Sequence, residues 1–455
     1  MSRVHFIAIG GAVMHNLAIA LHKKGYLVTG SDDEIFEPSR SRLAACGLLP
    51  SSIGWNPSAI TSDIDTVILG MHARMDNPEL IRAREMGVTI KSFPEYLYEQ
   101  TRGKKRIVVA GSHGKTTTTA MIMHALRHSG VAFDYMVGSS VDGFDTMTWL
   151  SDDSQLAVFE GDEYLTSPVD RRPKFHLYKP DIAVITGIAW DHKNVFPTFD
   201  NYVEQFRLFA GTITENGILI YCGEDPEVVA VASGGRADIK KIPYRTHAYF
   251  QNRTGFYAAT ISRTVPLQIF GEHNLQNLSA AREACIAAGL TEDQFYDAIA
   301  TFAGTSKRLQ KILETDKGVV YLDFAHAPSK VKATIGAVYE RYPGRNIIAC
   351  LELHTFSSLS SDFISLYEGT MDKATVPFVY FNPHAVMMKK LPMLTKSQIK
   401  ACFANENIIV FDDSSEMFGH ITSLRIEKPV YLFMSSGDFG GADMESIAKK
   451  LLSNK

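Results

Sequence analysis

The chain of 455 residues is too long for one hydrophobic core and suits about two to four domains. Its composition, 45% hydrophobic and 21% charged, is ordinary for a globular protein. A formal net charge of −4 gives no general attraction to nucleic acid or to an anionic membrane. The five cysteines are scattered and form no Cys-x-x-Cys pair, which argues against a disulfide framework or a structural zinc site. We therefore expect a cytoplasmic protein with no nucleic-acid partner and no membrane partner.

The first block of the chain has the pattern of a strand, a glycine turn, a helix and a second strand. Strands are predicted over Val4–Ile9 and over 26–30, and an acidic residue follows the second strand, as in Rossmann-like nucleotide sites. A packed βαβ unit without a ligand is one alternative, and an oxidoreductase that binds NAD(P) through this turn is another. The candidate binding residues of this block are Gly10, Gly11, Ser31 and Asp32.

The segment over 111–118, Gly-Ser-His-Gly-Lys-Thr-Thr-Thr, carries the strongest signal in the chain. It follows an apolar run that predicts a buried strand, and it opens a stretch that predicts a helix over Thr119–Leu126. Glycines let backbone N–H groups face an anion, and a helix N-terminus adds partial positive charge. In such a loop Lys115 suits the β- and γ-phosphates, and the hydroxyl of Thr116 suits Mg²⁺. The alternative is an accidental glycine-rich turn before a helix.

Two later apolar strands are predicted to end near this loop. The strand over 155–159 leads to Glu160, and the strand over 181–187 leads to His192. Nearly continuous apolar strands suit a parallel sheet, where ligands bind at the carboxyl ends. We expect Glu160 to bind Mg²⁺ together with Thr116, and a solvated acidic turn is the alternative. Imidazole is a less typical ligand for Mg²⁺, so a buried polar role is the alternative for His192.

Asp162 and Glu163 follow the candidate magnesium ligand and suit a positioning role. Further along the chain, His273, Asn274 and Asn277 open an alanine-rich helix. Their side chains suit a nucleobase, and helix capping is the alternative for Asn274.

The third block begins near Ser306 and alternates strands with helices, as an open α/β sheet does. Arg308 lies at its start and suits a phosphate group, with a solvated junction charge as the alternative. Asp323 and His326 close its first predicted strand, over 319–324, and are candidates because ligands bind at strand ends.

These motifs, in this order, resemble the Mur ligase family of ATP-dependent amide ligases over nearly the whole chain. The resemblance implies a three-domain α/β architecture with ATP and Mg²⁺ as cofactors. A Rossmann-like N-terminal domain over 1–101 would bind a UDP-sugar, a central P-loop ATPase domain would span 102–305, and a Rossmann-like C-terminal domain over 306–455 would bring the amine.

The resemblance also implies a role for each candidate residue. The catalytic residues would be Lys115, Glu160 and His192, and the metal ligands would be Thr116, Glu160 and His192. The ATP-binding residues would be Gly111, His113, Gly114, Lys115, Thr116, Thr117, His273, Asn274, Asn277, Arg308 and Asp323. The substrate-binding residues would be Gly10, Gly11, Ser31, Asp32, Asn77 and His326.

The N-terminal motifs are similar to those of family members that start from UDP-N-acetylmuramate. One kind adds L-alanine in peptidoglycan synthesis, and another adds L-alanyl-γ-D-glutamyl-meso-diaminopimelate in peptidoglycan recycling. The segments over 159–164, 170–175 and 434–441 resemble the tripeptide-adding members, which favours that activity. The chain departs from the family at Ala189, where a glutamate is common, and over 352–356, where an arginine is expected. A nucleotide-gated binding protein is the alternative from another class, and the oligomeric state stays open.

Overall fold

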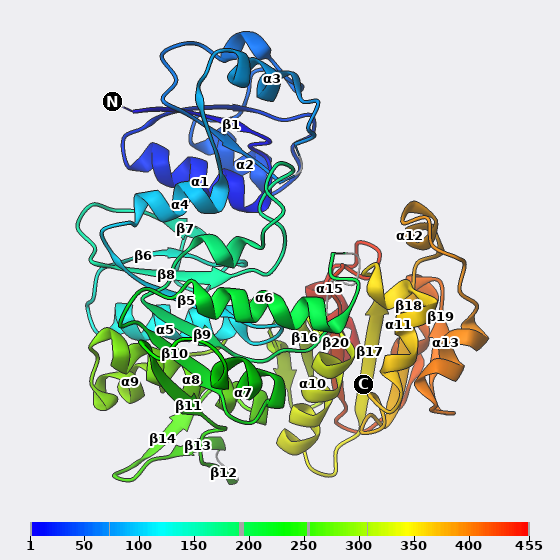
Figure 1. Ribbon diagram of the computed structural model, residues 1–455. Helices are drawn as coiled ribbons and strands as arrows, with labels where there is room; N and C mark the ends of the chain where they lie inside the picture. The colour runs from blue at the N-terminus through cyan, green and yellow to red at the C-terminus, as the bar shows by residue number, and fades with distance from the viewer. Residues whose placement is uncertain (1, 72, 191–194, 253–254, 307, 454–455) are drawn as a thin grey trace. The chain divides into compact units, whose positions relative to one another are not determined.

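The computed structural model describes residues 2–71, 73–190, 195–252, 255–306 and 308–453 (Figure 1). These residues form two compact units. The first unit comprises Met1–Ile188, Phe199–Arg245 and Leu278–Ile299, and the second comprises Ala189–Thr198, Thr246–Asn277 and Ala300–Lys455.

The N-terminal part of the first unit is a four-stranded parallel sheet in the order β2-β1-β3-β4. Apolar side chains of these strands form a core in which Ile7, Val67 and Leu69 pack with Leu80 of a helix that covers the sheet. The first strand ends two residues earlier than predicted, so the glycine pair lies wholly in the turn that opens α1. The elements are β1 (Arg3–Ile7), α1 (Ala12–Lys23), β2 (Leu27–Ser31), α2 (Ser39–Ala45), β3 (Thr66–Leu69), α3 (Pro78–Glu85), β4 (Thr89–Ser92) and α4 (Phe93–Gln100).

The rest of the first unit is built on a seven-stranded sheet in the order β11-β10-β9-β5-β8-β6-β7. All neighbouring pairs are parallel except β6 and β7. The strand before the glycine loop is therefore central, with β8 and β9 on either side. The sequence predicted a parallel sheet in which these three strands end at one edge, but not their order. The elements are β5 (Lys105–Ala110), α5 (Lys115–His128), β6 (Phe133–Met136), β7 (Thr148–Trp149), β8 (Leu156–Gly161), β9 (Ile182–Ile185), α6 (Phe199–Gly211), β10 (Ile218–Cys222), α7 (Pro226–Ser233), β11 (Lys240–Tyr244) and α9 (Glu292–Ile299).

The second unit contains a three-stranded antiparallel sheet, β12-β13-β14, and a six-stranded sheet in the order β15-β16-β20-β17-β18-β19. The core of the larger sheet includes Ile348, Phe378 and Phe433. Its first strand is β15, which pairs antiparallel with β16 and was missed because its side chains are only partly buried. The elements are β12 (Tyr249–Asn252), β13 (Gly255–Ala259), β14 (Thr264–Leu267), β15 (Gln310–Thr315), β16 (Gly318–Asp323), α10 (Pro328–Arg341), β17 (Ile347–Leu353), α11 (Ser361–Ile364), β18 (Val376–Phe381), α12 (Pro383–Met388), α13 (Lys396–Phe403), β19 (Ile409–Phe411), α14 (Ser414–Ser423), β20 (Val430–Met434) and α15 (Met444–Ser453). The residues of α8 (Glu272–Ala288) are divided between the two units.

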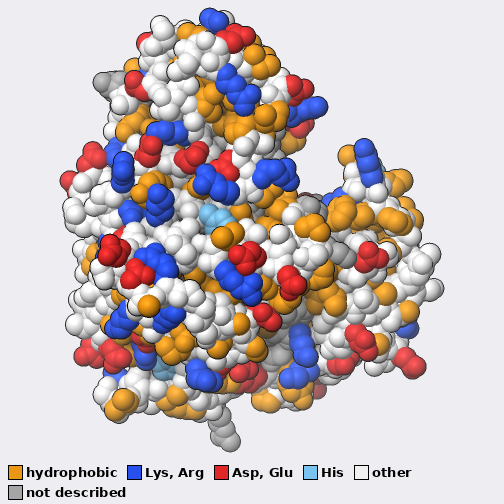
Figure 2. Space-filling view, viewed as in Figure 1, with side chains coloured by type: hydrophobic (Ala, Val, Ile, Leu, Met, Phe, Trp, Pro, Cys, Tyr) orange, Lys and Arg blue, Asp and Glu red, His pale blue; other side chains and the backbone are white. Residues whose placement is uncertain are grey.

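Acidic and basic side chains are interspersed on the face of the molecule that Figure 2 shows, as expected for a chain with a small net charge. Within the part of the chain that the structure describes, no helix is both long and apolar enough to cross a bilayer.

Candidate functional site

The glycine loop after β5 is fixed by its own backbone and by the end of β9. Gly111 has a φ of +137° and Gly114 a φ of +74°, conformations that side chains disfavour. A Cβ at Gly111 would lie 2.1 Å from the Oγ1 atom of Thr186. That hydroxyl contacts the carbonyl groups of Ala110 and His113, so the loop is tied to the neighbouring strand.

Gly114 is the N-cap of α5, so the helix begins at Lys115, four residues earlier than the sequence predicted. The left-handed glycine turns the chain directly into the helix, and the threonines that follow are buried in the helix rather than held in a loop. The first N–H groups of a helix have no acceptor within it. The loop residues Gly111, His113, Gly114, Lys115, Thr116 and Thr117 thus lie together at a helix N-terminus.

Glu160 lies in β8, next to the glycine loop, and only 8% of its surface is exposed. Its Oε1 atom accepts a hydrogen bond from the Oγ1 atom of Thr116 at 2.9 Å, and its Oε2 atom accepts one from the N–H of Gly138 at 2.7 Å. A Cβ at Gly138 would lie 2.9 Å from the carboxylate, so only glycine fits there without a shift. The structure therefore brings Thr116 and Glu160 into direct contact.

The contact between a hydroxyl and a carboxylate provides oxygen ligands of the kind that Mg²⁺ prefers. Proteins commonly bind Mg²⁺ through one or two carboxylates, while phosphate and water complete its coordination. Thr116 and Glu160 fit this pattern. His192, the other expected metal ligand, lies outside the described residues.

Lys115 is held by a carboxylate that follows β8. Its Nζ atom donates to the Oε2 atom of Glu163 at 2.7 Å and to the carbonyl of Gly111. Burial would lower the pKa of Lys115, but the charges of Glu163 and Asp162 outweigh it and raise the pKa above its usual value. Asp162 is itself paired with Lys174 at 2.5 Å. Lys115 is therefore a permanent cation at the start of α5.

In the N-terminal sheet, the turn after β1 meets the end of β2. The N–H of Gly10 donates to the Oδ2 atom of Asp32 at 2.7 Å, and both residues lie beside Gly11 and Ser31. Burial raises the pKa of Asp32 to about 6, against the lowering effect of the hydrogen bond from Gly10. The four residues that the sequence singled out here are thus neighbours.

Ser31 donates to Glu79, a fully buried carboxylate that also accepts from the N–H of Asn56 at 2.6 Å. Asn77 is the N-cap of α3, because its Oδ1 atom accepts from the N–H groups of Glu79 and Leu80 at 2.9 and 3.1 Å. The oxygen of Asn77 therefore has a structural partner within the protein.

In the second unit, α8 begins at Glu272, so Asn274 lies inside the helix and does not cap it. The capping alternative is wrong for this residue: its Nδ2 atom donates back to the carbonyl of Phe270 at 2.9 Å. Asn274 and Asn277 are both buried. Burial lowers the pKa of His273, and the negative charge of Asp323 works against that shift.

The other candidate binding residues of the second unit lie near the end of β16. The Oδ2 atom of Asp323 accepts from the N–H of Leu309 at 2.5 Å, which fixes the segment that carries Arg308. The guanidinium of Arg308 lies 4.7 Å from the ring centre of Phe324, and the Nδ1 atom of His326 lies 2.8 Å from the Phe324 carbonyl oxygen. Arg308, Asp323 and His326 are therefore clustered.

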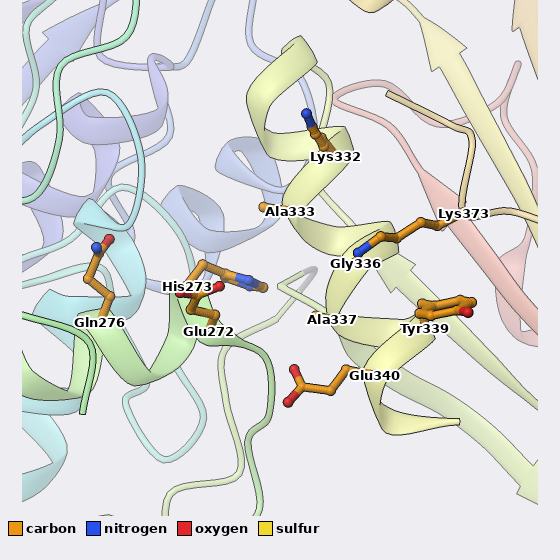
Figure 3. Close-up of a pocket in the computed structure, with 10 residues that line it drawn as sticks. All are labelled: Glu272, His273, Gln276, Lys332, Ala333, Gly336, Ala337, Tyr339, Glu340 and Lys373. Atoms are coloured by element: carbon orange, nitrogen blue, oxygen red, sulfur yellow. The ribbon is translucent and has the colours of Figure 1, made fainter. Parts of the chain in front are cut away.

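A pocket of about 490 Å³ lies between the start of α8 and α10. Figure 3 shows the imidazole of His273 projecting toward α10, with Lys332 and Lys373 on other sides of the pocket. Small residues of α10, Ala333, Gly336 and Ala337, leave room there. Of the three expected nucleobase residues, His273 is the one that lines this pocket.

A second polar cluster lies where β17 and β20 end. Glu352 is buried and accepts from the hydroxyl of Ser435 and from the N–H of Phe439 at 2.9 Å. The Nδ1 atom of His354 lies 3.7 Å from the Glu352 carboxylate, and the His354 side chain is 41% exposed. A Cβ at Gly437 would lie 2.7 Å from His354, so this glycine is needed for the close packing of the two strand ends.

Sequence reasoning missed two residues that complete the first unit's site. Gly138 binds Glu160 from a loop with no motif, so no signal pointed to it. Tyr202 of α6 binds Ser112 of the glycine loop, and helical periodicity marks it only as a buried position.

Comparison with known proteins identifies the class to which this fold and site belong. Two family models match the chain: "Mur ligase family, catalytic domain" over residues 3–105 and "Mur ligase middle domain" over residues 109–285. The UDP-N-acetylmuramate–L-alanine ligase of Chloroflexus aggregans is 31% identical over 390 residues, which cover 79% of this chain and 80% of that protein. The chain belongs to the Mur ligase family.

Solved structures share the α/β fold of this chain. The UDP-N-acetylmuramate–alanine ligase of Thermotoga maritima superposes with a TM-score of 0.72 at 20% identity and covers 100% of both chains. The UDP-N-acetylmuramate:L-alanyl-γ-D-glutamyl-meso-diaminopimelate ligase of Neisseria meningitides superposes with a TM-score of 0.60 at 25% identity and covers 66% of this chain and 98% of its own. As a member of this family, the chain is an ATP- and Mg²⁺-dependent amide ligase of peptidoglycan synthesis.

Proposed function

We propose that the chain joins UDP-N-acetylmuramate to L-alanyl-γ-D-glutamyl-meso-diaminopimelate through an acyl phosphate. The observation that carries the ligase chemistry is the contact between Thr116 and Glu160 beside the cation of Lys115. These groups combine a positive charge for phosphate with oxygen ligands for Mg²⁺ at one edge of a parallel sheet.

The proposed reaction has two steps. An oxygen of the sugar's lactyl carboxylate attacks the γ-phosphorus of ATP, and ADP leaves. The amine then attacks the carbonyl carbon, loses a proton, and phosphate leaves with the oxygen that bridged carbon and phosphorus. The ammonium of Lys115 stabilises the charge that develops on the transferred phosphoryl group. Thr116 and Glu160 would hold Mg²⁺, which would supply further positive charge there, and we assign His192 to a second magnesium site.

The other candidate residues receive roles in the same scheme. The loop over 111–117 binds the phosphates of ATP through its N–H groups. His273, Asn274 and Asn277 bind the adenine, and Arg308 and Asp323 complete the nucleotide site. The UDP-sugar binds to Gly10, Gly11, Ser31, Asp32 and Asn77. We also assign His326 to substrate binding. Because the oxygen of Asn77 caps α3, only its amide N–H groups are assigned to the sugar nucleotide.

We further propose three domains over 1–101, 102–305 and 306–455, and a cytoplasmic location, where all these substrates are available.

The choice of tripeptide rests on the chemistry at the end of β17. L-alanine offers only an ammonium, a carboxylate and a methyl group, and its carboxylate calls for a cation such as arginine. Here β17 ends in Glu352 and His354. The tripeptide carries a second ammonium on diaminopimelate, which the negative charge of the buried Glu352 beside His354 attracts, and three carboxylates, which need cations outside this cluster. The 25% identical Neisseria ligase, whose name gives this tripeptide, supports the same choice. L-alanine is the second candidate, because the 31% identical Chloroflexus ligase is named for it.

The test is phosphate release with ATP, Mg²⁺ and UDP-N-acetylmuramate, with either the tripeptide or L-alanine. We expect release with the tripeptide and none with L-alanine. Release with L-alanine alone would assign the second candidate. Release that needs neither sugar nor amine would instead indicate a nucleotide-gated ATPase. Lys115→Met is the negative control, in which we expect no phosphate release, because methionine keeps the length of the side chain and removes its positive charge.

A further inference from the structure

A buried chain of hydrogen bonds begins and ends in the glycine loop. Tyr202 of α6 has no exposed surface, and its Oη atom lies 2.9 Å from the Oγ atom of Ser112 and 3.1 Å from the Oε1 atom of Glu163. A carboxylate only accepts, and a tyrosine hydroxyl has one proton to donate. Tyr202 therefore donates to Glu163 and accepts from Ser112.

The other oxygen of Glu163 receives Lys115. The Oε2 atom lies 2.7 Å from the lysine Nζ atom, and 1% of the Glu163 side chain is exposed. Ser112, Tyr202, Glu163 and Lys115 thus form one continuous chain, in which the hydroxyl of Tyr202 fixes the carboxylate that in turn fixes the lysine. Glu160 does not belong to this chain of hydrogen bonds, because its carboxylate accepts from Thr116 and Gly138.

We propose that Glu163 is a positioning residue that holds Lys115 against the glycine loop, and that its negative charge weakens the binding of nucleotide phosphate. This inference rests on the proposed function, because it takes the loop over 111–117 as the phosphate site. A phosphate oxygen and the Glu163 carboxylate attract the same ammonium and repel each other. Glu163 therefore fixes the position of Lys115 and weakens the binding of the nucleotide. The hydroxyl of Tyr202 holds the Glu163 carboxylate in place.

The test uses the full-length protein and Glu163→Gln. The amide has the same shape: its oxygen accepts from Lys115, its nitrogen donates to Tyr202, and Tyr202 then donates to Ser112. The substitution removes the charge and keeps the chain of hydrogen bonds. By calorimetry with ADP and Mg²⁺, we expect the dissociation constant to fall about tenfold, because one nearby negative charge is gone. We expect kcat for phosphate release to fall, because a neutral acceptor holds Lys115 less firmly.

A second variant separates position from charge. Tyr202→Phe keeps the Glu163 charge and removes the hydroxyl that orients it. We expect the dissociation constant of ADP to stay within about twofold of wild type, since the charge is unchanged, while kcat falls severalfold. A Tyr202→Phe protein with wild-type kcat would overturn the positioning role, whether or not Glu163→Gln folds.

The matched control is Asp134→Asn. Asp134 is another buried carboxylate paired with a lysine, Lys104 at 2.6 Å, and it lies near the amino end of β6 in the same sheet. We expect its substitution to leave the ADP dissociation constant unchanged. If Glu163→Gln binds ADP no more tightly than wild type, the inference is overturned while the proposed function stands. If wild type itself binds no ADP, the proposed function fails and the inference fails with it.

Discussion

Glu160→Gln is the substitution that most sharply separates the chemistry of the site from its stability. The amide oxygen accepts from the N–H of Gly138 as the carboxylate does, and the amide nitrogen faces the Thr116 hydroxyl, which rotates to accept. Two hydrogen bonds to a charged acceptor become bonds to a neutral group, which costs about 1 kcal/mol each. We therefore expect the free energy of unfolding to fall by no more than about 2 kcal/mol.

The expected effect on activity is much larger. Loss of an outer partner of a metal ligand costs about 10- to 100-fold, and Glu160 is proposed as a direct ligand, so kcat is expected to fall at least about 100-fold. The assay is phosphate release over a Mg²⁺ titration, with urea unfolding of the same samples. Asp134→Asn, a buried carboxylate at the other end of the sheet, is expected to lose stability and keep the Mg²⁺ dependence. A Glu160→Gln enzyme with wild-type kcat and wild-type Mg²⁺ dependence would refute the assignment.

Three further substitutions test other parts of the molecule. Gly111→Ala places a Cβ 2.1 Å from Thr186 at a φ of +137°, so we expect about 2–4 kcal/mol of lost stability in urea unfolding, and a wild-type unfolding curve would contradict the loop geometry. Asp32→Asn tests the pKa of Asp32, which burial raises from 3.8 to about 6. Because the carboxyl group ionises less readily in the folded state than in the unfolded state, the free energy of unfolding of wild type should fall by up to about 3 kcal/mol relative to the variant as pH rises from 4 to 7. Parallel stability curves of the two proteins over that pH range would show that Asp32 is not perturbed. We propose that the exposed side chain of His354, beside Glu352, contacts the amine substrate; His354→Ala should then raise the KM of the amine about tenfold, a typical loss for one charged hydrogen bond, without a change in the KM of ATP. Equal effects on both KM values would place His354 elsewhere in the mechanism.

The parts of the site that the sequence predicted are those whose residues are neighbours in the chain. The strand, glycine turn and lysine at 106–116 are contiguous, and strong apolar runs marked β8 and β9 as strands of the same parallel sheet. Because parallel strands end at one edge of a sheet, Thr116 and Glu160 were expected at the same edge. Their direct contact depends on β8 lying next to β5, which the structure shows.

The parts that were not predictable depend on tertiary packing. Tyr202 reaches Ser112 across 90 residues of chain, and nothing in its helical pattern distinguishes a hydrogen-bonded tyrosine from an ordinary core residue. Gly138 supports Glu160 from an irregular loop. The antiparallel strands β12, β13 and β14 have short, mixed patterns, so no periodicity marked them. The start of α5 was placed too late because four consecutive β-branched threonines, Thr116–Thr119, follow Lys115, and such residues disfavour helix where packing does not override them.

The central claim is that this site activates a carboxylate as an acyl phosphate. The most direct measurement is the fate of oxygen from UDP-N-acetylmuramate labelled with ¹⁸O in the lactyl carboxylate. After one turnover with ATP, Mg²⁺ and the tripeptide, the account predicts that each phosphate released carries one ¹⁸O atom, because the bridging oxygen leaves with phosphorus. Unlabelled phosphate would mean that water, and not the carboxylate, attacks ATP, and would contradict the account.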